Sequence, residues 1–178
     1  MQEGKDELER ARERVIEAIS QNMNLYGVTP SIGRLWGLLY FQNEPMTLDE
    51  MKNELGMSKT SMSTSVRTLM ELKMVEKVWR KGVRKDLYKA EEDWHKNFFD
   101  FFDIKWRAAI SLNVHAIKKS LQELHEITES KDADAEIQAS AKADIQKLTE
   151  ALDYYDWLIR LIDSFASKDI FNYIPLKK

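Results

Sequence analysis

The sequence predicts a mainly α-helical protein that carries one small β-hairpin. Only six Gly and three Pro interrupt 178 residues, and most of the chain repeats its apolar residues at the spacing of an amphipathic helix. One stretch, residues 74–90, instead holds two short runs rich in Val, Trp and Tyr around Lys-Gly, which is typical of a hairpin. The balance of 43% hydrophobic and 32% charged residues is that of a folded globular chain.

Composition excludes several classes of protein. The chain has no Cys, which excludes disulfides, a thiol nucleophile and a zinc ribbon. No apolar run approaches the ~20 residues of a membrane span, and the charged N-terminal residues lack the apolar region of a signal peptide. We therefore expect a cytoplasmic protein with no membrane partner.

Residues 1–28 predict an amphipathic helix. Its apolar stripe consists of Leu8, Val15, Ile19 and Met23. Gly27 stands where a helix C-terminus favours Gly. Thr29 as N-cap and Pro30 at the first helical position then start a second helix, which runs to about Gln42 and is apolar on nearly all sides.

Two shorter helices follow, each with a clear start signal. Thr47 and Glu50 form a capping box, and Gly56 ends the first of these helices. Ser58 caps the next helix, residues 58–72. Its expected buried stripe is Met62, Val66 and Leu69, with Met70 as a further candidate, and its expected outward face is Lys59, Thr60, Ser61, Ser63, Thr64 and Arg67. With the hairpin, whose tip carries Arg80, Lys81, Arg84 and Lys85, residues 29–90 predict a winged helix-turn-helix domain.

The remaining chain, residues 91–178, predicts two long helices over about 91–127 and 134–165. Two helices of this length cannot bury their apolar stripes on a small winged domain alone, so they favour a homodimer. We therefore expect residues 1–28 and 91–178 to serve dimerisation around the winged domain of residues 29–90.

The charge distribution favours nucleic acid as the partner. Residues 58–89 hold nine Lys or Arg against three acids, a net charge of +6, so the total of −3 leaves −9 on the rest of the chain. Hydroxyls and cations on one helix face suit phosphates and base edges in the DNA major groove, and the hairpin tip would contact the backbone or minor groove. The alternative is a solvated polar helix of some other small domain.

Several stretches resemble the MarR family of bacterial regulators, and within it the GbsR-type branch. They are "LYGVTPSIGRLWG", "MTLDEMKNELGMSKTSMSTSVRTL", "MVEKVWRKGVRKDLY" and "IKWRAAI". The resemblance implies a homodimeric transcription regulator whose two Ser58–Leu72 helices enter successive major grooves, about 34 Å apart, at a double-stranded DNA operator. The wing departs from the wider family because "GVRKDLY" replaces its Asp-x-Arg turn, which leaves the pose of Arg84 unassigned.

The same resemblance implies control of choline or glycine betaine genes by a quaternary ammonium ligand held in an aromatic box. Aromatic faces attract such a cation, which donates no hydrogen bond. The candidate box residues are Trp36, Tyr40, Trp94, Phe98 and Phe102, and the alternative phase of the run would turn Phe99 and Phe101 inward instead of Phe98 and Phe102. A betaine carboxylate would also need a donor such as Arg34 or His95, whereas choline would not. The alternative is that these aromatics are plain core and that the effector is different or absent.

An enzyme is not expected. The sequence has no phosphate-binding Gly-rich loop, no Gly-flanked Ser and no HExxH, and His115 and His125 are too far apart for one helical turn. We predict no catalytic residues, no metal site and no cofactor. A small helical enzyme that uses Asp93, Trp94 and His95 is the least favoured reading.

Overall fold

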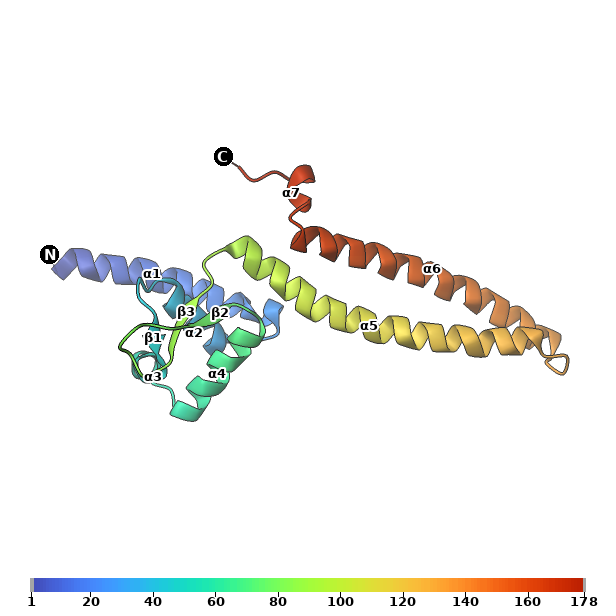
Figure 1. Cartoon of the computed structure of the whole chain (residues 1–178), viewed down its shortest axis with the longest axis horizontal. Coiled ribbons are helices and arrows are strands. Elements are labelled where there is room, and N and C mark those ends of the chain that lie inside the picture. The colour runs from blue at the N-terminus through green and yellow to red at the C-terminus, as the bar shows by residue number, and fades with distance from the viewer. Residues whose placement is uncertain (1, 178) are drawn as a thin grey trace. The chain divides into compact units, whose positions relative to one another are not determined.

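The computed structural model describes residues 2–177, which divide into two compact units, residues 2–101 and 102–177 (Figure 1). The long helix α5 (Trp94–Glu129) begins in the first unit and continues in the second. None of the helices in residues 2–177 is long and apolar enough to cross a membrane.

The first unit is a winged helix-turn-helix with an additional N-terminal helix. Its elements are α1 (Gln2–Asn22), the 3-10 helix η1 (Met23–Tyr26), α2 (Pro30–Tyr40), β1 (Met46–Thr47), α3 (Leu48–Leu55), α4 (Lys59–Glu71), β2 (Val75–Val78) and β3 (Leu87–Ala90). The strands form an antiparallel sheet in the order β1-β3-β2, and Met46 pairs with Tyr88 (Figure 1). The prediction of a mainly helical fold with a small β wing is confirmed.

The predicted helix boundaries are confirmed where local signals set them. Thr47 and Glu50 form the complete capping box, in which the Thr47 amide donates to Glu50 Oε2 at 2.7 Å. Gly27 and Gly56 adopt the left-handed conformation, with φ of 69° and 63°, that ends a helical segment. Ser58 Oγ accepts a hydrogen bond from the Ser61 amide at 3.1 Å.

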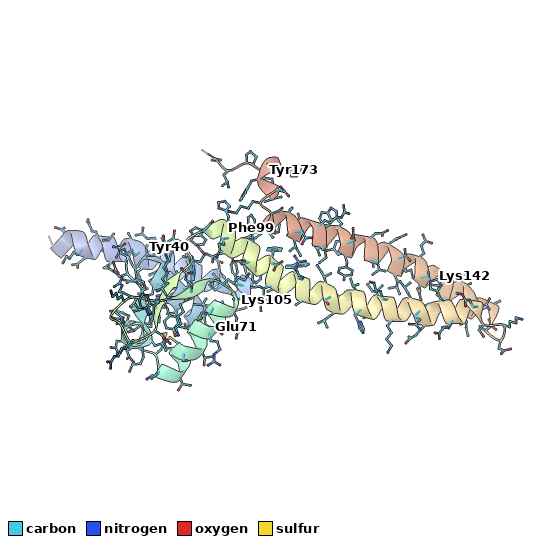
Figure 2. All side chains as sticks on the ribbon, viewed as in Figure 1. Tyr40, Glu71, Phe99, Lys105, Lys142 and Tyr173 are labelled. Carbon is cyan, nitrogen blue, oxygen red and sulfur yellow. The ribbon has the colours of Figure 1, made fainter. Side chains whose placement is uncertain are left out.

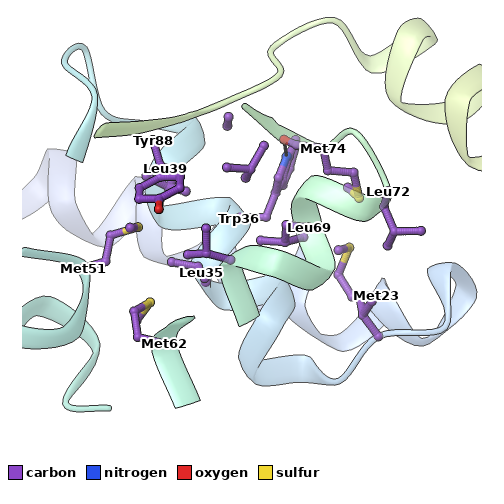
Figure 3. Close-up of a cluster of buried hydrophobic side chains, with 14 residues drawn as sticks. Met23, Leu35, Trp36, Leu39, Met51, Met62, Leu69, Leu72, Met74 and Tyr88 are labelled. Carbon is purple, nitrogen blue, oxygen red and sulfur yellow. Dashed lines mark hydrogen bonds between the residues drawn. The ribbon is translucent and has the colours of Figure 1, made fainter. Parts of the chain in front are cut away.

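A single hydrophobic core lies under α2, α3, α4 and the sheet. Its fully buried large side chains include Trp36, Leu35, Met51, Met62 and Leu69, which Figure 3 shows together with neighbouring members of the cluster. Four methionines lie in this cluster of fourteen buried residues, so flexible thioethers fill much of the space between the helices. The prediction that Met70 joins this core is wrong, because Met70 is exposed and Ser65 is buried instead.

Helix α1 packs closely on α2, and the predicted stripe is confirmed only in part, because Met23 is buried in the core and Ile19 packs against it. Leu8 and Val15 are exposed, whereas Ile16 and Ser20 are buried against α2. A Cβ at Gly33 would lie 3.0 Å from the Ser20 Cα, so the missing side chain permits the close approach. The Ser20 hydroxyl donates to the Pro30 carbonyl at 2.7 Å and fastens the two helices where α2 begins.

The hairpin strands are shorter than the sequence suggested. They cover Val75–Val78 and Leu87–Ala90, and residues 79–86 form the loop at the wing tip. The third strand, β1, was not predicted. Its two residues pair with β3 from a position about forty residues earlier in the chain, so no local alternation marks it.

The second unit is a helical hairpin, in which α5 runs antiparallel to α6 (Ala135–Ala166) and the short α7 (Ile170–Tyr173) follows (Figure 1). Ile110, Leu158 and Ile162 form its buried centre, and the Arg107 guanidinium lies between Asp103 and Asp163 at 2.7 and 2.9 Å. Large side chains remain exposed on this unit, among them Leu112, Ile137, Tyr154, Trp157 and Tyr173, the last of which Figure 2 labels at the C-terminal end.

Candidate nucleic-acid interface and apolar pocket

Helix α4 presents one polar face. Met62, Val66 and Leu69 hold its inner side in the core, which leaves the predicted contact residues on the outside. Ser58, Lys59, Thr60, Ser61, Thr64 and Arg67 are exposed, and Ser63 is half-buried. The first turn of α4 contains no acid, so the free amides at its N-terminus meet no negative side chain of their own helix. The last residue of the helix, Glu71, marks its acidic end (Figure 2).

The wing tip and the start of α4 meet at a shallow polar hollow of about 330 Å³. Lys59 from α4 and Arg84 and Lys85 from the wing line it, together with Asp49, Asp86, Thr47 and Leu48. The structure therefore brings cations from both predicted contact elements to one place on the first unit. Arg80 and Lys81, also exposed, lie in the same loop of residues 79–86.

Ion pairs attach the wing loop to neighbouring elements. Arg80 pairs with Glu44, and Lys85 pairs with Asp49 at 2.9 Å. The hydrogen bond from Lys85, reinforced by its charge, lowers the pKa of Asp49, and the same contact raises the pKa of Lys85. Asp86 pairs with Lys77 at 2.8 Å, so this wing acid supports the base of the hairpin.

Three of the five predicted ligand residues contact one another. The Trp36 ring stacks on Tyr40 with centroids 5.1 Å apart, and Trp94 meets Trp36 and Tyr40 edge-on at 5.0 and 5.4 Å. The Trp94 Nε1 donates to the Tyr40 hydroxyl at 3.0 Å. Because the rings touch each other, a cation can reach them only from outside the trio.

An apolar pocket of about 410 Å³ lies beside this trio, within the first unit. Trp36 and Trp94 contribute to its wall, and the remaining lining residues are Arg14, Val15, Ala18, Ile19, Asn22, Met23, Leu25, Tyr26, Met74 and Asn97. Burial raises the pKa of the Tyr26 phenol above its ordinary value. Asn97 is buried, and its Oδ1 accepts no hydrogen bond from any residue in the described range.

One backbone carbonyl connects the pocket wall to the wing. The Met74 oxygen accepts hydrogen bonds from Trp36 Nε1 at 3.1 Å and from the Glu91 amide at 2.9 Å. Asn97 Nδ2 donates to the Glu91 carbonyl, also at 2.9 Å. Met74 follows α4 and precedes β2, so Trp36 is bonded directly to the segment that joins the predicted reading helix to the wing, and Asn97 is connected to it through Glu91.

The other predicted ligand residues lie elsewhere. Phe98 contacts Phe99, with ring centroids 6.1 Å apart, and does not line the pocket. Phe102 belongs to the second unit, where it stacks on Trp106 and meets Phe165 edge-on. The proposed carboxylate donor Arg34 instead forms ion pairs with Glu13 and Glu17.

Sequence reasoning missed three pocket residues that carry polar groups. Asn22, Asn97 and Arg14 all line the pocket, but neither α1 cations nor α5 amides stand out by spacing. Tyr26 was noticeable as an aromatic next to a helix-ending Gly, and it contacts Phe101 edge-on at 4.8 Å. In residues 2–177 no group of three or more His, Asp or Glu side chains is arranged to hold a metal ion.

Comparison with known proteins identifies the family. Residues 94–172 match the family described as "GbsR family transcriptional regulator, C-terminal helical hairpin". The chain is 42% identical to the HTH-type transcriptional repressor GbsR of Bacillus subtilis over 96% of this chain and 94% of that protein. It is 39% identical to the HTH-type transcriptional repressor OpcR of the same organism, over 97% and 94% of the two chains.

A solved structure supports the fold. A crystal structure described as that of a transcriptional regulator aligns with a TM-score of 0.56 and 16% identity, and covers 88% of this chain and 99% of that chain. The named relatives are regulators of transcription, which confirms the prediction that the chain is not an enzyme. The helical hairpin, the winged unit and the identity along nearly the whole chain lead to one conclusion, that the chain belongs to the GbsR family of transcriptional regulators.

Proposed function

We propose that the protein is a homodimeric, DNA-binding transcriptional repressor of osmoprotectant uptake or synthesis genes, and that a quaternary ammonium ligand controls it. The observation that carries the DNA-binding part is the polar hollow in which Lys59 of α4 meets Arg84 and Lys85 of the wing. Two relatives named as repressors support the direction of regulation.

In this proposal α4 is the reading helix. Its hydroxyls and Arg67 contact base edges in the major groove, and the first-turn amides that Ser58 does not cap lie at a phosphate. Arg80, Lys81, Arg84 and Lys85 of the wing neutralise neighbouring phosphates, which gives the binding a steep dependence on salt. The proposed domain roles are those predicted from the sequence. Residues 29–90 bind DNA, and residues 1–28 and 91–178 serve dimerisation.

The dimer is supported by apolar side chains that a single chain leaves uncovered. Leu112, Ile137 and Trp157 are each more than half exposed on the second unit. On α1, Leu8 is 50% exposed. Soluble proteins seldom leave large apolar side chains exposed along whole helices, and a second copy would cover both faces. Two reading helices would then match an operator with two half-sites, about 34 Å apart.

The pocket beside Trp36 and Trp94 is the proposed ligand site. Its apolar wall and its indole and phenol rings suit a trimethylammonium group, and its polar groups are few. The buried Asn97 Oδ1 would accept from a choline hydroxyl, whereas the Arg14 guanidinium would pair with a betaine carboxylate. The cage of the proposal is therefore Trp36, Trp94 and Tyr26, with Tyr40 supporting Trp94 from behind.

A second reading is favoured by one observation. Trp36 is only 1% exposed and contacts both Tyr40 and Trp94, as a core residue would. In that reading the aromatics stabilise the winged unit, and the repressor answers to a different effector or to none.

Fluorescence anisotropy on the DNA upstream of the protein's own gene tests the proposal. The titration runs across salt concentrations, with and without choline and glycine betaine. Tight, salt-sensitive DNA binding that one osmolyte alters supports both the proposed DNA contacts of α4 and the wing and the proposed ligand site. Trp94→Phe keeps an aromatic face and serves as the control for Trp94→Ala, which should lose the osmolyte response but keep DNA binding. DNA binding that neither osmolyte changes would mean that the aromatic side chains serve only as core residues. Absence of DNA binding would refute the proposal that the protein is a repressor.

A further inference from the structure

The wing carries an exposed indole that no feature described above uses. Trp79 stands at the end of β2 and is 82% exposed. Trp is ordinarily among the more buried residues on average, so a nearly bare indole on a small domain is unusual. Val83, 37% exposed, is a second apolar side chain in the same loop.

The loop that presents Trp79 is ordered by its own contacts. The Val83 amide donates to the Arg80 carbonyl at 3.1 Å, and Gly82 between them has φ of +86°. This closes a tight turn whose third position favours Gly. The pairs Arg80–Glu44 and Lys85–Asp49 then tie both sides of the turn to the segment around α3. The exposure of Trp79 is thus a property of a fixed turn.

The charges around Trp79 point to a polyanion as the partner. The loop of residues 79–86 holds four cations, Arg80, Lys81, Arg84 and Lys85, and one acid, Asp86, which pairs with Lys77. An apolar ring on a loop rich in cations matches a DNA minor groove, where sugar rings form the walls and phosphates form the rims. Arg80 and Lys85 already pair with Glu44 and Asp49, but a purely apolar protein surface would offer no opposite charge to the exposed Lys81 and Arg84.

We propose that Trp79 is the apolar contact of the wing in the DNA minor groove next to the major groove that α4 reads. This inference rests on the proposed function, because it needs a protein that binds DNA. The indole packs against sugar walls while the flanking cations contact the two phosphate rims. Because the indole is bulky, the affinity for DNA should depend on the width of the minor groove at base pairs that α4 does not contact. This is recognition of DNA shape rather than of base identity.

Fluorine NMR tests the contact directly. Incorporation of 5-fluorotryptophan labels all five Trp, and the resonance that disappears in Trp79→Phe is that of Trp79. The DNA is a duplex cut from the footprint on the protein's own promoter. Addition of this duplex should shift the Trp79 resonance more than the other four. No shift of this resonance in a sample that binds the duplex would overturn the inference.

Affinity and salt dependence give an independent measurement. Trp79→Ala should weaken binding about tenfold, which corresponds to ~1.4 kcal/mol, without changing the salt slope, because an indole releases no counterions. Lys81→Ala on the same turn should lower the slope by about one unit. Trp79→Phe keeps a ring and should stay within about threefold of the parent protein. Equal affinities of the parent and Trp79→Ala would overturn the inference and leave the proposed function intact.

Modified DNA identifies the groove. Replacing adenine by 2,6-diaminopurine beside the half-site adds an amino group to the minor groove and leaves the major-groove edge unchanged. This change in the DNA should weaken binding by the parent protein more than it weakens binding by Trp79→Ala. An equal effect on both would exclude the minor-groove position. If the parent protein binds no promoter DNA at all, the proposed function fails, and this inference fails with it.

Discussion

The contact between α1 and α2 at Gly33 offers a sharp test of how the first unit is held together. Gly33→Ala adds one methyl group where the two helices touch. That methyl would lie 2.9 Å from the Met23 Cβ, 3.0 Å from the Ser20 Cα, and in overlap with the Met23 Cγ. The Met23 side chain can rotate away, but the Ser20 backbone can move only if α1 moves with it.

Two effects of opposite sign determine how much Gly33→Ala changes the free energy of unfolding. Ala in place of Gly inside a helix favours folding by about 1 kcal/mol. Overpacking a tight contact disfavours it by about 1–3 kcal/mol. The contact with the Met23 Cβ at 2.9 Å is shorter than real Cβ atoms show, and the Ser20 Cα at 3.0 Å is tighter than most and belongs to the backbone, so the packing effect should win. We expect Gly33→Ala to lower the free energy of unfolding by about 1 kcal/mol.

Urea unfolding at one fixed protein concentration measures this change, since the stability of the proposed dimer would depend on concentration. Gly37→Ala is the matched control on the same helix, because its nearest neighbour is the Ile16 Cγ2 at 3.1 Å. Gly37→Ala should therefore lower the free energy of unfolding by less than Gly33→Ala does. In a Met23→Ala background the Gly33 substitution should become less harmful, with a coupling of about 1 kcal/mol. A Gly33→Ala protein more stable than its parent would refute the reasoning.

Three further outcomes are expected. Arg67→Ala should weaken operator binding by about 1–3 kcal/mol if its guanidinium contacts a base edge, while Glu71→Ala at the far end of α4 should not, as competition with labelled promoter DNA would show. Ser58→Ala should lower the free energy of unfolding by about 1 kcal/mol through loss of the N-cap, measured by thermal unfolding. Because the hydrogen bond from Lys85 lowers the pKa of Asp49, the stabilising effect of this pair is present above the ordinary Asp pKa and lost as pH falls through the lowered one. A carbon-detected NMR titration should therefore find the pKa of Asp49 back near its ordinary value in Lys85→Met.

Sequence predicted those parts of the fold that depend on a few adjacent residues. The capping box at Thr47 and the N-cap at Ser58 each need only a hydroxyl and an amide three residues apart, so the pattern is sufficient. The long helix α5, expected over about 91–127, covers Trp94–Glu129, because periodic apolar residues without Gly or Pro leave little freedom in its length.

The rest depends on partners distant in the chain. Val15 and Ile16 are adjacent and both apolar, and only the position of α2 decides that Ile16 is the buried one. Strand β1 exists because β3 offers Leu87 and Tyr88 for pairing. The even spacing of Trp94, Phe98 and Phe102 suggested one box, yet each ring contacts a different set of neighbours. A four-residue spacing places side chains on one face of a helix. It does not determine which neighbouring residues pack against each turn of that face.

The shared Met74 carbonyl has a thermodynamic consequence. Trp36 in the pocket wall and Glu91 at the end of the wing sheet both donate to this one oxygen, so neither can move freely while the other bond holds. A molecule that displaces Trp36 disturbs the segment between α4 and β2, and DNA that repositions α4 disturbs the wall of the pocket. Binding free energies coupled in this way are reciprocal: the factor by which an effector changes operator affinity is also the factor by which the operator changes effector affinity. An effector titration with operator present would thus give the strength of regulation without any measurement of transcription.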